Sequence, residues 1–274
     1  MTRLSTRFAS LKREGRAGLV AYVMANDPDH ETCFEILRGL PAAGADVIEL
    51  GFPFSDPMAD GVSIQLAAQR ALKAGGSLRK TLELARRFRV EDQDTPLILM
   101  GYANPVEHMS YDVFSREMAN AGADGAIIVD LPPEEDAPLR AAFAAHDLSI
   151  IRLAAPTTDD NRLTKVLDGA SGFLYYVSVA GVTGAAAAAA GAVRAAVERL
   201  KRATDLPIAV GFGVRAPETA RAIAETADAV VVGSAFVDEI AAAPPGQAAE
   251  HVLRKVRLLS EAVRSARAME GTPA

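Results

Sequence analysis

The chain contains very little cysteine, because Cys33 is the only one among its 274 residues. A single thiol excludes an intrachain disulfide and a cysteine-based metal site, and we expect Cys33 to be buried in the core. Basic charge is scarce as well, since the 29 Lys and Arg residues form no cluster and the formal net charge is −6. This balance disfavours nucleic acids and anionic membrane surfaces as partners.

Long apolar segments are also missing. Residues 1–7 lack the apolar stretch of a signal peptide. No apolar run is long enough to span a bilayer, apart from an alanine-rich segment that is too weakly hydrophobic to count. We therefore expect a soluble, cytoplasmic protein. Its 50% hydrophobic and 23% charged residues are typical of globular proteins.

Several catalytic motifs are absent from the sequence. It has no nucleophile elbow, no Walker loop and no lysine at a strand end that could form a Schiff base. Its histidines are scattered over predicted helices and loops, so we predict no metal site; they are His30, His108, His146 and His251. Any chemistry must therefore depend on carboxylates and hydrogen bonds.

Apolar runs alternate with helical patterns along the chain. The runs are nearly continuous, as expected for strands covered on both faces; they span residues 18–24, 47–50, 96–101, 125–130, 148–153, 172–177, 207–211 and 228–233. The helical patterns span residues 29–43, 62–73, 77–90, 110–120, 134–146, 159–168, 191–203, 216–226, 234–241 and 247–269. A further short amphipathic helix is predicted over residues 4–14, where it would cover an apolar surface.

This alternation predicts an α/β fold. Eight strand–helix units in ~250 residues match a (β/α)8 TIM barrel with an extra N-terminal helix. No linker rich in Pro, Gly and Ser interrupts it, so we expect one domain over residues 1–274 with a core at about 16–265. A doubly wound open sheet is the alternative, although the first strand–helix turn, residues 26–28, lacks a dinucleotide-binding glycine pattern. A Gly-Ala-Asp or Ala-Asp sequence also precedes three predicted strands, ending at Asp46, Asp124 and Asp228.

The stretch from Asp46 to Gly61 contains two carboxylates of interest. Glu49 lies within an apolar strand, where a charge is costly unless it is paired or used, and Asp60 lies on the proline-rich loop that follows. One interpretation brings both to an active site at the carboxyl ends of the strands. The other makes Glu49 a hydrogen-bonded core carboxylate and Asp60 a helix N-cap, and this stretch alone does not decide between them.

Glycines after the last two strands predict a phosphate site. Residues 211–213 read Gly-Phe-Gly, and Gly233-Ser234 opens a helix whose free N–H groups favour an anion. The loop at 181–184 could add further N–H groups, whereas the simpler alternative is that these glycines only allow tight turns. Apolar residues at strand ends and loops suit a flat aromatic ligand; they are Tyr22, Ile64, Met100, Ile127, Tyr175 and Phe212.

These segments resemble the tryptophan synthase alpha subunit family over almost the whole chain. The most specific is E-L-G-F-P-F-S-D-P-M-A-D-G at 49–61, and the others lie at 101–105, 130–132, 180–184, 211–213 and 233–234. The resemblance implies a lyase of tryptophan biosynthesis that cleaves indole-3-glycerol phosphate to indole and glyceraldehyde 3-phosphate. It also implies an alpha2-beta2 heterotetramer, in which the pyridoxal phosphate belongs to the beta subunit and this chain carries no cofactor.

The same resemblance assigns roles to residues. Glu49 would be the acid–base group, Asp60 would accept the indole N–H, and Tyr175 and Thr183 would position them. Phosphate would bind at Gly184, Gly213, Gly233 and Ser234, and the indole would lie against Tyr22, Ile64, Met100, Ile127 and Phe212. The beta subunit would face Pro53, Asp56, Pro57, Asn104, Asp130 and Pro132.

Two positions depart from the family pattern. Residues 185–190 are six alanines where polar residues are expected, and Tyr22 stands where Phe is expected. Two other functions stay open from the residues alone. One is a different phosphate-binding barrel isomerase, which would not need Asp60, and the other is a non-catalytic subunit that activates a partner.

Overall fold

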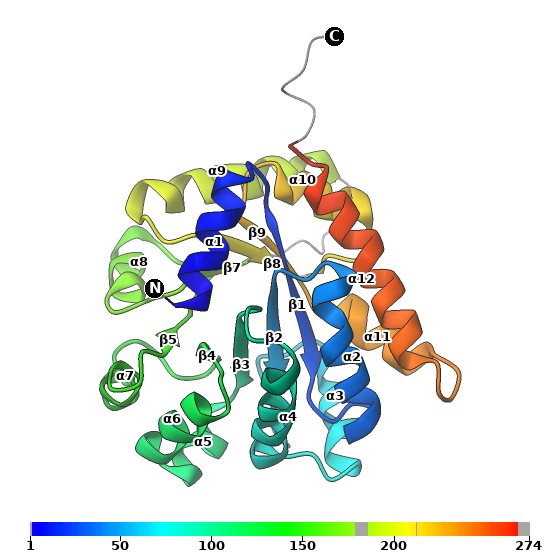
Figure 1. The fold of residues 1–274 in the computed structure, drawn as a ribbon. Helices are drawn as coiled ribbons and strands as arrows, with labels where there is room; N and C mark the ends of the chain where they lie inside the picture. Colours follow the sequence, from blue (N-terminus) through cyan, green and yellow to red (C-terminus); the bar gives the residue numbers. More distant parts are fainter. Residues whose placement is uncertain (1, 179–185, 212, 268–274) are drawn as a thin grey trace.

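The strands form one parallel sheet that curls into a nearly closed barrel (Figure 1). The computed structural model describes residues 2–178, 186–211 and 213–267. Within these ranges nine strands lie in the order β5-β4-β3-β2-β1-β9-β8-β7-β6. They are β1 (Gly18–Met24), β2 (Val47–Gly51), β3 (Leu97–Gly101), β4 (Gly125–Ile128), β5 (Ser149–Ile150), β6 (Arg152–Ala154), β7 (Leu174–Val177), β8 (Ile208–Gly211) and β9 (Ala229–Val232).

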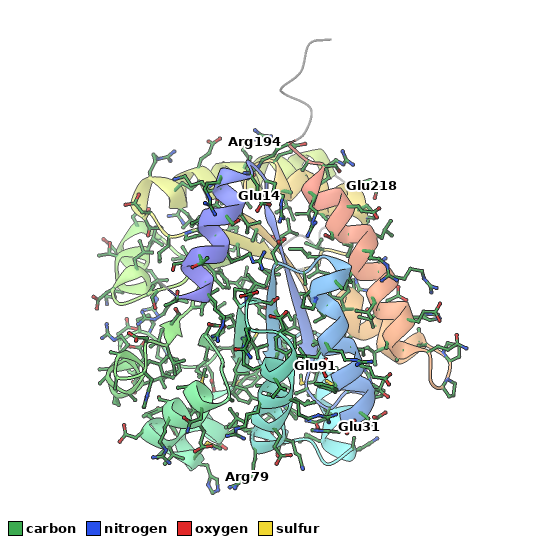
Figure 2. All side chains as sticks on the ribbon, in the orientation of Figure 1. Glu14, Glu31, Arg79, Glu91, Arg194 and Glu218 are labelled. Atoms are coloured by element: carbon green, nitrogen blue, oxygen red, sulfur yellow. The ribbon has the colours of Figure 1, made fainter. Side chains whose placement is uncertain are left out.

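Helices surround this sheet, and a strand–helix alternation confirms the barrel predicted from the sequence. They are α1 (Arg3–Arg13), α2 (His30–Ala43), α3 (Val62–Lys73), α4 (Leu78–Glu91), α5 (Ala103–Met109), α6 (Tyr111–Asn120), α7 (Ala137–Ala144), α8 (Asp160–Leu167), α9 (Ala186–Ala203), α10 (Pro217–Ala224), α11 (Ser234–Ala242) and α12 (Ala248–Arg264). Their polar faces point to solvent, and Figure 2 shows the exposed side chains of Glu31 and Arg79 at the edge of the molecule.

The fifth predicted strand is divided in two. β5 pairs with β4, and β6 pairs with β7, while Ile151 joins them and donates its N–H to the carbonyl of Ala126 at 3.1 Å. The nine strand segments therefore occupy the eight strand positions that the sequence predicts. The chain leaves β4 after Ile151 and then pairs with β7, so this step connects the two ends of the sheet.

The N-terminal helix α1 plugs the barrel at the beginning of its strands (Figure 1). Leu4, Phe8 and Leu11 are buried and join the cluster of strand side chains that fills the barrel interior, including Phe173. The rings of Phe8 and Phe173 are 5.7 Å apart. Burying each of these side chains contributes about 1.5–3 kcal/mol, so the apolar face predicted for residues 4–14 has a clear role.

The three aspartates that precede strands have a shared structural role. The carboxylates of Asp46, Asp124 and Asp228 accept the backbone N–H groups of Leu19, Leu97 and Ile208 at 3.0, 2.8 and 2.9 Å. Each aspartate thereby connects the start of the strand that follows it to the start of the neighbouring strand, at the end of the barrel that α1 covers. Arg16, Arg89 and Lys201 balance the three charges. The repeated sequence is therefore explained by strand pairing.

One helix was missed by the sequence analysis. Residues 103–109 form α5, and the helical patterns in the sequence do not include this segment. The prediction was wrong because a proline in the first helical turn removes no intrahelical hydrogen bond. Cys33 is buried, as predicted. Among the described residues, no helix is both long and apolar enough to cross a membrane.

Candidate active site

A cavity of about 390 Å³ lies at the carboxyl ends of the strands. Side chains from β1, β2, β3, β7 and β9 form its floor, and the chain segments that follow β2, β8 and β9 form its rim. A larger groove of about 1090 Å³ lies beside α1 at the other end and is lined by Arg3, Lys12 and Asp124 among others. The smaller cavity is the candidate site, because it contains both carboxylates selected from the sequence, Glu49 and Asp60.

Glu49 is held inside the barrel by β2. Its side chain is 1% exposed, and neither carboxylate oxygen has a hydrogen-bond partner among the described residues. Burial raises the pKa of Glu49 to about 8, since a charged carboxylate loses its hydration there. The group therefore carries a proton at neutral pH and can act as an acid. Within the described part of the chain, Glu49 is therefore not a hydrogen-bonded core carboxylate.

Asp60 lies on the loop after β2, at the edge of the same cavity. Burial raises the pKa of Asp60 to about 6, and a hydrogen bond from the Tyr102 hydroxyl acts in the opposite direction. Helix α3 begins at Val62 with Gly61 as its N-cap and has no side-chain cap. Asp60 is therefore not the N-cap of α3, and the second half of the structural interpretation is excluded as well.

Two tyrosines face these carboxylates. Tyr175 on β7 is buried, and burial, Glu49 and Asp60 raise the pKa of its phenol. Tyr22 on β1 lies opposite Glu49 in the strand register, and its pKa is raised by burial, Asp60 and Glu49. Both hydroxyl groups stay protonated at neutral pH and can donate hydrogen bonds to a ligand.

The far end of the cavity provides backbone groups. Gly213, with φ of +75°, and Gly233 line it together with Ser234, the first residue of α11. The first N–H groups of a helix have no intrahelical acceptor and attract anions. The Arg215 guanidinium is paired with Asp238. An anion at this end would therefore be bound mainly by amides, as the glycine pattern predicts.

The remaining predicted pocket residues fall into three groups. Tyr22, Ile64 and Met100 line the cavity. Ile127 is fully buried in the barrel interior and does not line it. Phe212, Thr183 and Gly184 lie outside the described residues. Among the aliphatic lining residues that the sequence analysis missed, four lie on strands or directly after one, and alternation along the strands could have identified them; they are Val129, Leu153, Val177 and Val231.

Residues predicted to face a partner follow β2, β3 and β4, which are neighbours in the sheet. Asp56, Asn104 and Pro132 are exposed, and Asp130 is half-buried and accepts the N–H of Ala103 at 2.7 Å. Pro57 is half-buried, but Pro53 is buried and offers little surface. The loop after β2, the loop after β4 and the start of α5 thus lie on one side of the cavity rim.

The fold and the cavity define a barrel protein in which a carboxyl group that is protonated at neutral pH shares a cavity with a second carboxyl group and with the start of α11. The chain matches the model of the family described as tryptophan synthase alpha chain over residues 8–268. It is 60% identical over 269 residues to the tryptophan synthase alpha chain of Caulobacter vibrioides, covering 97% of each chain. The chain therefore belongs to the tryptophan synthase alpha chain family.

Solved structures agree with this assignment. Tryptophan synthase subunit alpha from Legionella pneumophila superimposes with a TM-score of 0.89 at 38% identity, covering 96% of this chain and 98% of that one. A chain of Mycobacterium tuberculosis tryptophan synthase gives a TM-score of 0.86 at 35% identity, over 96% and 98% of the two chains. The nearly closed barrel is therefore the fold of this family.

Proposed function

We propose that this chain cleaves indole-3-glycerol phosphate to indole and glyceraldehyde 3-phosphate by a retro-aldol reaction. The observation that supports this most directly is the state of Glu49, whose buried oxygens have no partner among the described residues and whose pKa is about 8. A carboxylic acid in that state can protonate C3 of the indole ring, so that the ring leaves as a neutral molecule. The carboxylate that results can then take the proton of the side-chain hydroxyl.

Asp60 has the complementary role in this proposal. With a pKa of about 6, its carboxylate is mostly ionised at neutral pH. It can accept the indole N–H and stabilise the positive charge that develops on the ring when C3 is protonated. The two carboxyl groups work in different states because Glu49 is completely buried, whereas Asp60 has a hydroxyl donor and partial access to water.

The rest of the cavity suits the other parts of the substrate. The ring would lie against Tyr22, Ile64 and Met100, and the phosphate would lie at Gly213, Gly233 and Ser234. Tyr175 would position Glu49 and the substrate. Thr183 and Gly184, for which the family resemblance predicts positioning and phosphate-binding roles, lie outside the described residues.

The partner in this proposal is the tryptophan synthase beta subunit, in an alpha2-beta2 heterotetramer. It would contact the exposed rim residues Asp56, Asn104 and Pro132. The pyridoxal phosphate would belong to that subunit, and this chain would carry no cofactor. We also propose that the whole chain is one domain, because its described strands form one sheet; the cytoplasmic location stays a prediction.

Glu49→Gln tests the reaction. The amide matches the carboxylic acid in size but has no proton to transfer, so indole release should fall at least ~10³-fold. Binding of indole propanol phosphate should be retained, because the phosphate amides and the ring pocket are unchanged. Wild-type turnover in this variant would refute the proposal. Absence of lyase activity in the wild-type chain, with and without the beta subunit, would favour a non-catalytic activating subunit.

A further inference from the structure

Tyr102 connects the loop that carries Asp60 to the barrel. It is the single residue between β3 and α5, and its side chain is 3% exposed. Its hydroxyl accepts the N–H of Ala59 at 3.0 Å, and Tyr102 and Asp60 line the same small cavity. Because the contact with Ala59 uses only a lone pair, the hydroxyl proton is available to the carboxylate of the next residue, Asp60.

The ring of Tyr102 fixes the hydroxyl in place. It packs against Phe54 with ring centroids 5.4 Å apart at an angle of 30°. Tyr102 is absent from the wall of the main cavity and instead lines a small neighbouring cavity together with Tyr22, Phe54, Pro57 and Asp60. Asp60 lines both cavities, so it connects Tyr102 to the main one.

We propose that Tyr102 is a positioning residue for the lyase reaction, whose hydroxyl holds the Asp60 carboxylate in its ionised form and in the orientation that receives the indole N–H. This inference rests on the proposed function of Asp60. A hydrogen bond to a carboxylate favours the charged form, and such charge-assisted bonds are among the strongest in proteins. The Ala59 contact adds a backbone restraint directly beside Asp60.

Other charged and titratable groups lie near Asp60 or Tyr102 and could also influence the ionisation of Asp60. Those that line the same cavity are Glu49 on β2, Tyr22 on β1, Tyr175 on β7 and Arg215 after β8. The charge of Asp130, after β4, acts on Tyr102. Arg215 is already paired with Asp238, and Glu49 is protonated at neutral pH. Tyr22 donates its hydroxyl to the sulfur of Met24 at 3.9 Å. Tyr102, whose hydroxyl lies on the N–H of Ala59, is therefore the donor that we assign to Asp60.

Tyr102→Phe is the direct test, because it keeps the ring packed on Phe54 and removes only the hydroxyl. The pH dependence of kcat/KM should have an acid limb, which reports ionisation of Asp60 near pH 6. In the variant this limb should move to higher pH by about one unit, with about tenfold lower kcat/KM at pH 5.5. The alkaline limb, which reports Glu49, should stay in place.

Tyr111→Phe is the matched control. It also removes a phenol hydroxyl hydrogen bonded to a carboxylate, that of Glu107 at 2.9 Å, but on the surface. Neither limb should move in this variant. An acid limb of Tyr102→Phe that coincides with the wild-type limb, with unchanged kcat and KM, overturns the inference while the proposed function stands.

A second variant gives a shift of opposite sign and keeps the full shape of the side chain. Replacement of Tyr102 by 2,3,5-trifluorotyrosine makes the phenol a stronger donor, so the acid limb should move to lower pH. The pKa of Asp60 can also be followed without substrate, by carbon-13 NMR of aspartate carboxyl groups with Asp60→Asn for assignment. An Asp60 signal that titrates identically in wild type and both Tyr102 variants rejects the inference even if the chain has no lyase activity.

Discussion

Tyr22 on β1 lies directly opposite Glu49 on β2, so that a phenol and a protonated carboxyl group enter the same cavity. The Tyr22 side chain is 5% exposed. Its hydroxyl donates only a weak bond, to the thioether of Met24 at 3.9 Å. A position where the sequence resemblance led us to expect Phe thus contains a poorly satisfied buried hydroxyl.

Tyr22→Phe should consequently be as stable as the wild type or more stable, by up to about 1 kcal/mol. A buried hydroxyl loses hydration that a thioether acceptor restores only in part. Urea unfolding of the two proteins, with equal slopes, measures the difference. Destabilisation by more than ~1 kcal/mol would mean that this hydroxyl has a stronger partner in solution.

Glu49→Gln should change how stability depends on pH. The wild-type group has a pKa of about 8 when folded, against 4.5 for the free side chain. Between these values the folded protein holds a proton that the unfolded chain releases, so wild-type stability falls as pH rises from about 4.5 to about 8. The glutamine does not titrate, so its stability does not fall in this way. The free energy of unfolding of Glu49→Gln, relative to wild type, should therefore rise by ~2–4 kcal/mol over that pH range.

Chemical unfolding of both proteins at pH 5 and pH 8 checks this expectation. Asp60→Asn is a useful comparison, since the pKa of Asp60 is raised only to about 6. The loss of stability that Asp60 causes should therefore end near pH 6, whereas that caused by Glu49 continues to about pH 8. Equal stability differences between wild type and Glu49→Gln at both pH values would contradict a raised pKa for Glu49.

Gly233→Ala should weaken binding of the phosphate end of the substrate. A Cβ atom at this position would lie 3.3 Å from the Cβ atom of Tyr22, inside the cavity wall that leads to α11. We expect KM for indole-3-glycerol phosphate to rise about tenfold, which is about 1.4 kcal/mol, with a smaller change in kcat. Steady-state indole release measures both constants.

Gly191→Ala is the control for that substitution. Gly191 lies in α9, and no described atom is within 4 Å of the added methyl group. It should stabilise the helix by roughly 0.5–1 kcal/mol and leave KM unchanged. An unchanged KM in Gly233→Ala as well would place the phosphate elsewhere.

Asp46→Asn should destabilise the barrel more than Asp228→Asn. Both carboxylates accept a strand N–H, but Asp46 is 2% exposed and its Arg16 partner is also largely buried, whereas Asp228 and Lys201 are both partly exposed. Removing one charge from a buried pair costs about 3–5 kcal/mol, and an exposed pair contributes up to ~1 kcal/mol. Thermal or urea unfolding measures the order, and both variants should keep the wild-type KM because they lie at the opposite end of the barrel from the site.

The sequence alone determined the barrel, because local patterns carry that information. Buried parallel strands appear in the sequence as apolar runs. Gly44, with φ of +108°, ends α2 at the last residue of the helix predicted over 29–43. The same local logic failed at α5, which has a proline in its first turn and was not predicted as a helix. It also could not show that the fifth strand divides at Ile151, since that step depends on which neighbour the strand follows.

The properties of the site were decided by tertiary structure. The sequence placed Glu49 and Asp60 close to each other along the chain but left open whether they were structural. Only packing showed that Glu49 lacks a partner among the described residues and that Gly61 rather than Asp60 caps α3. Packing also showed that Tyr102, which follows β3, contacts the loop that carries Asp60. A pKa and a hydrogen bond depend on what surrounds a group in space, and residues distant in sequence provide those surroundings.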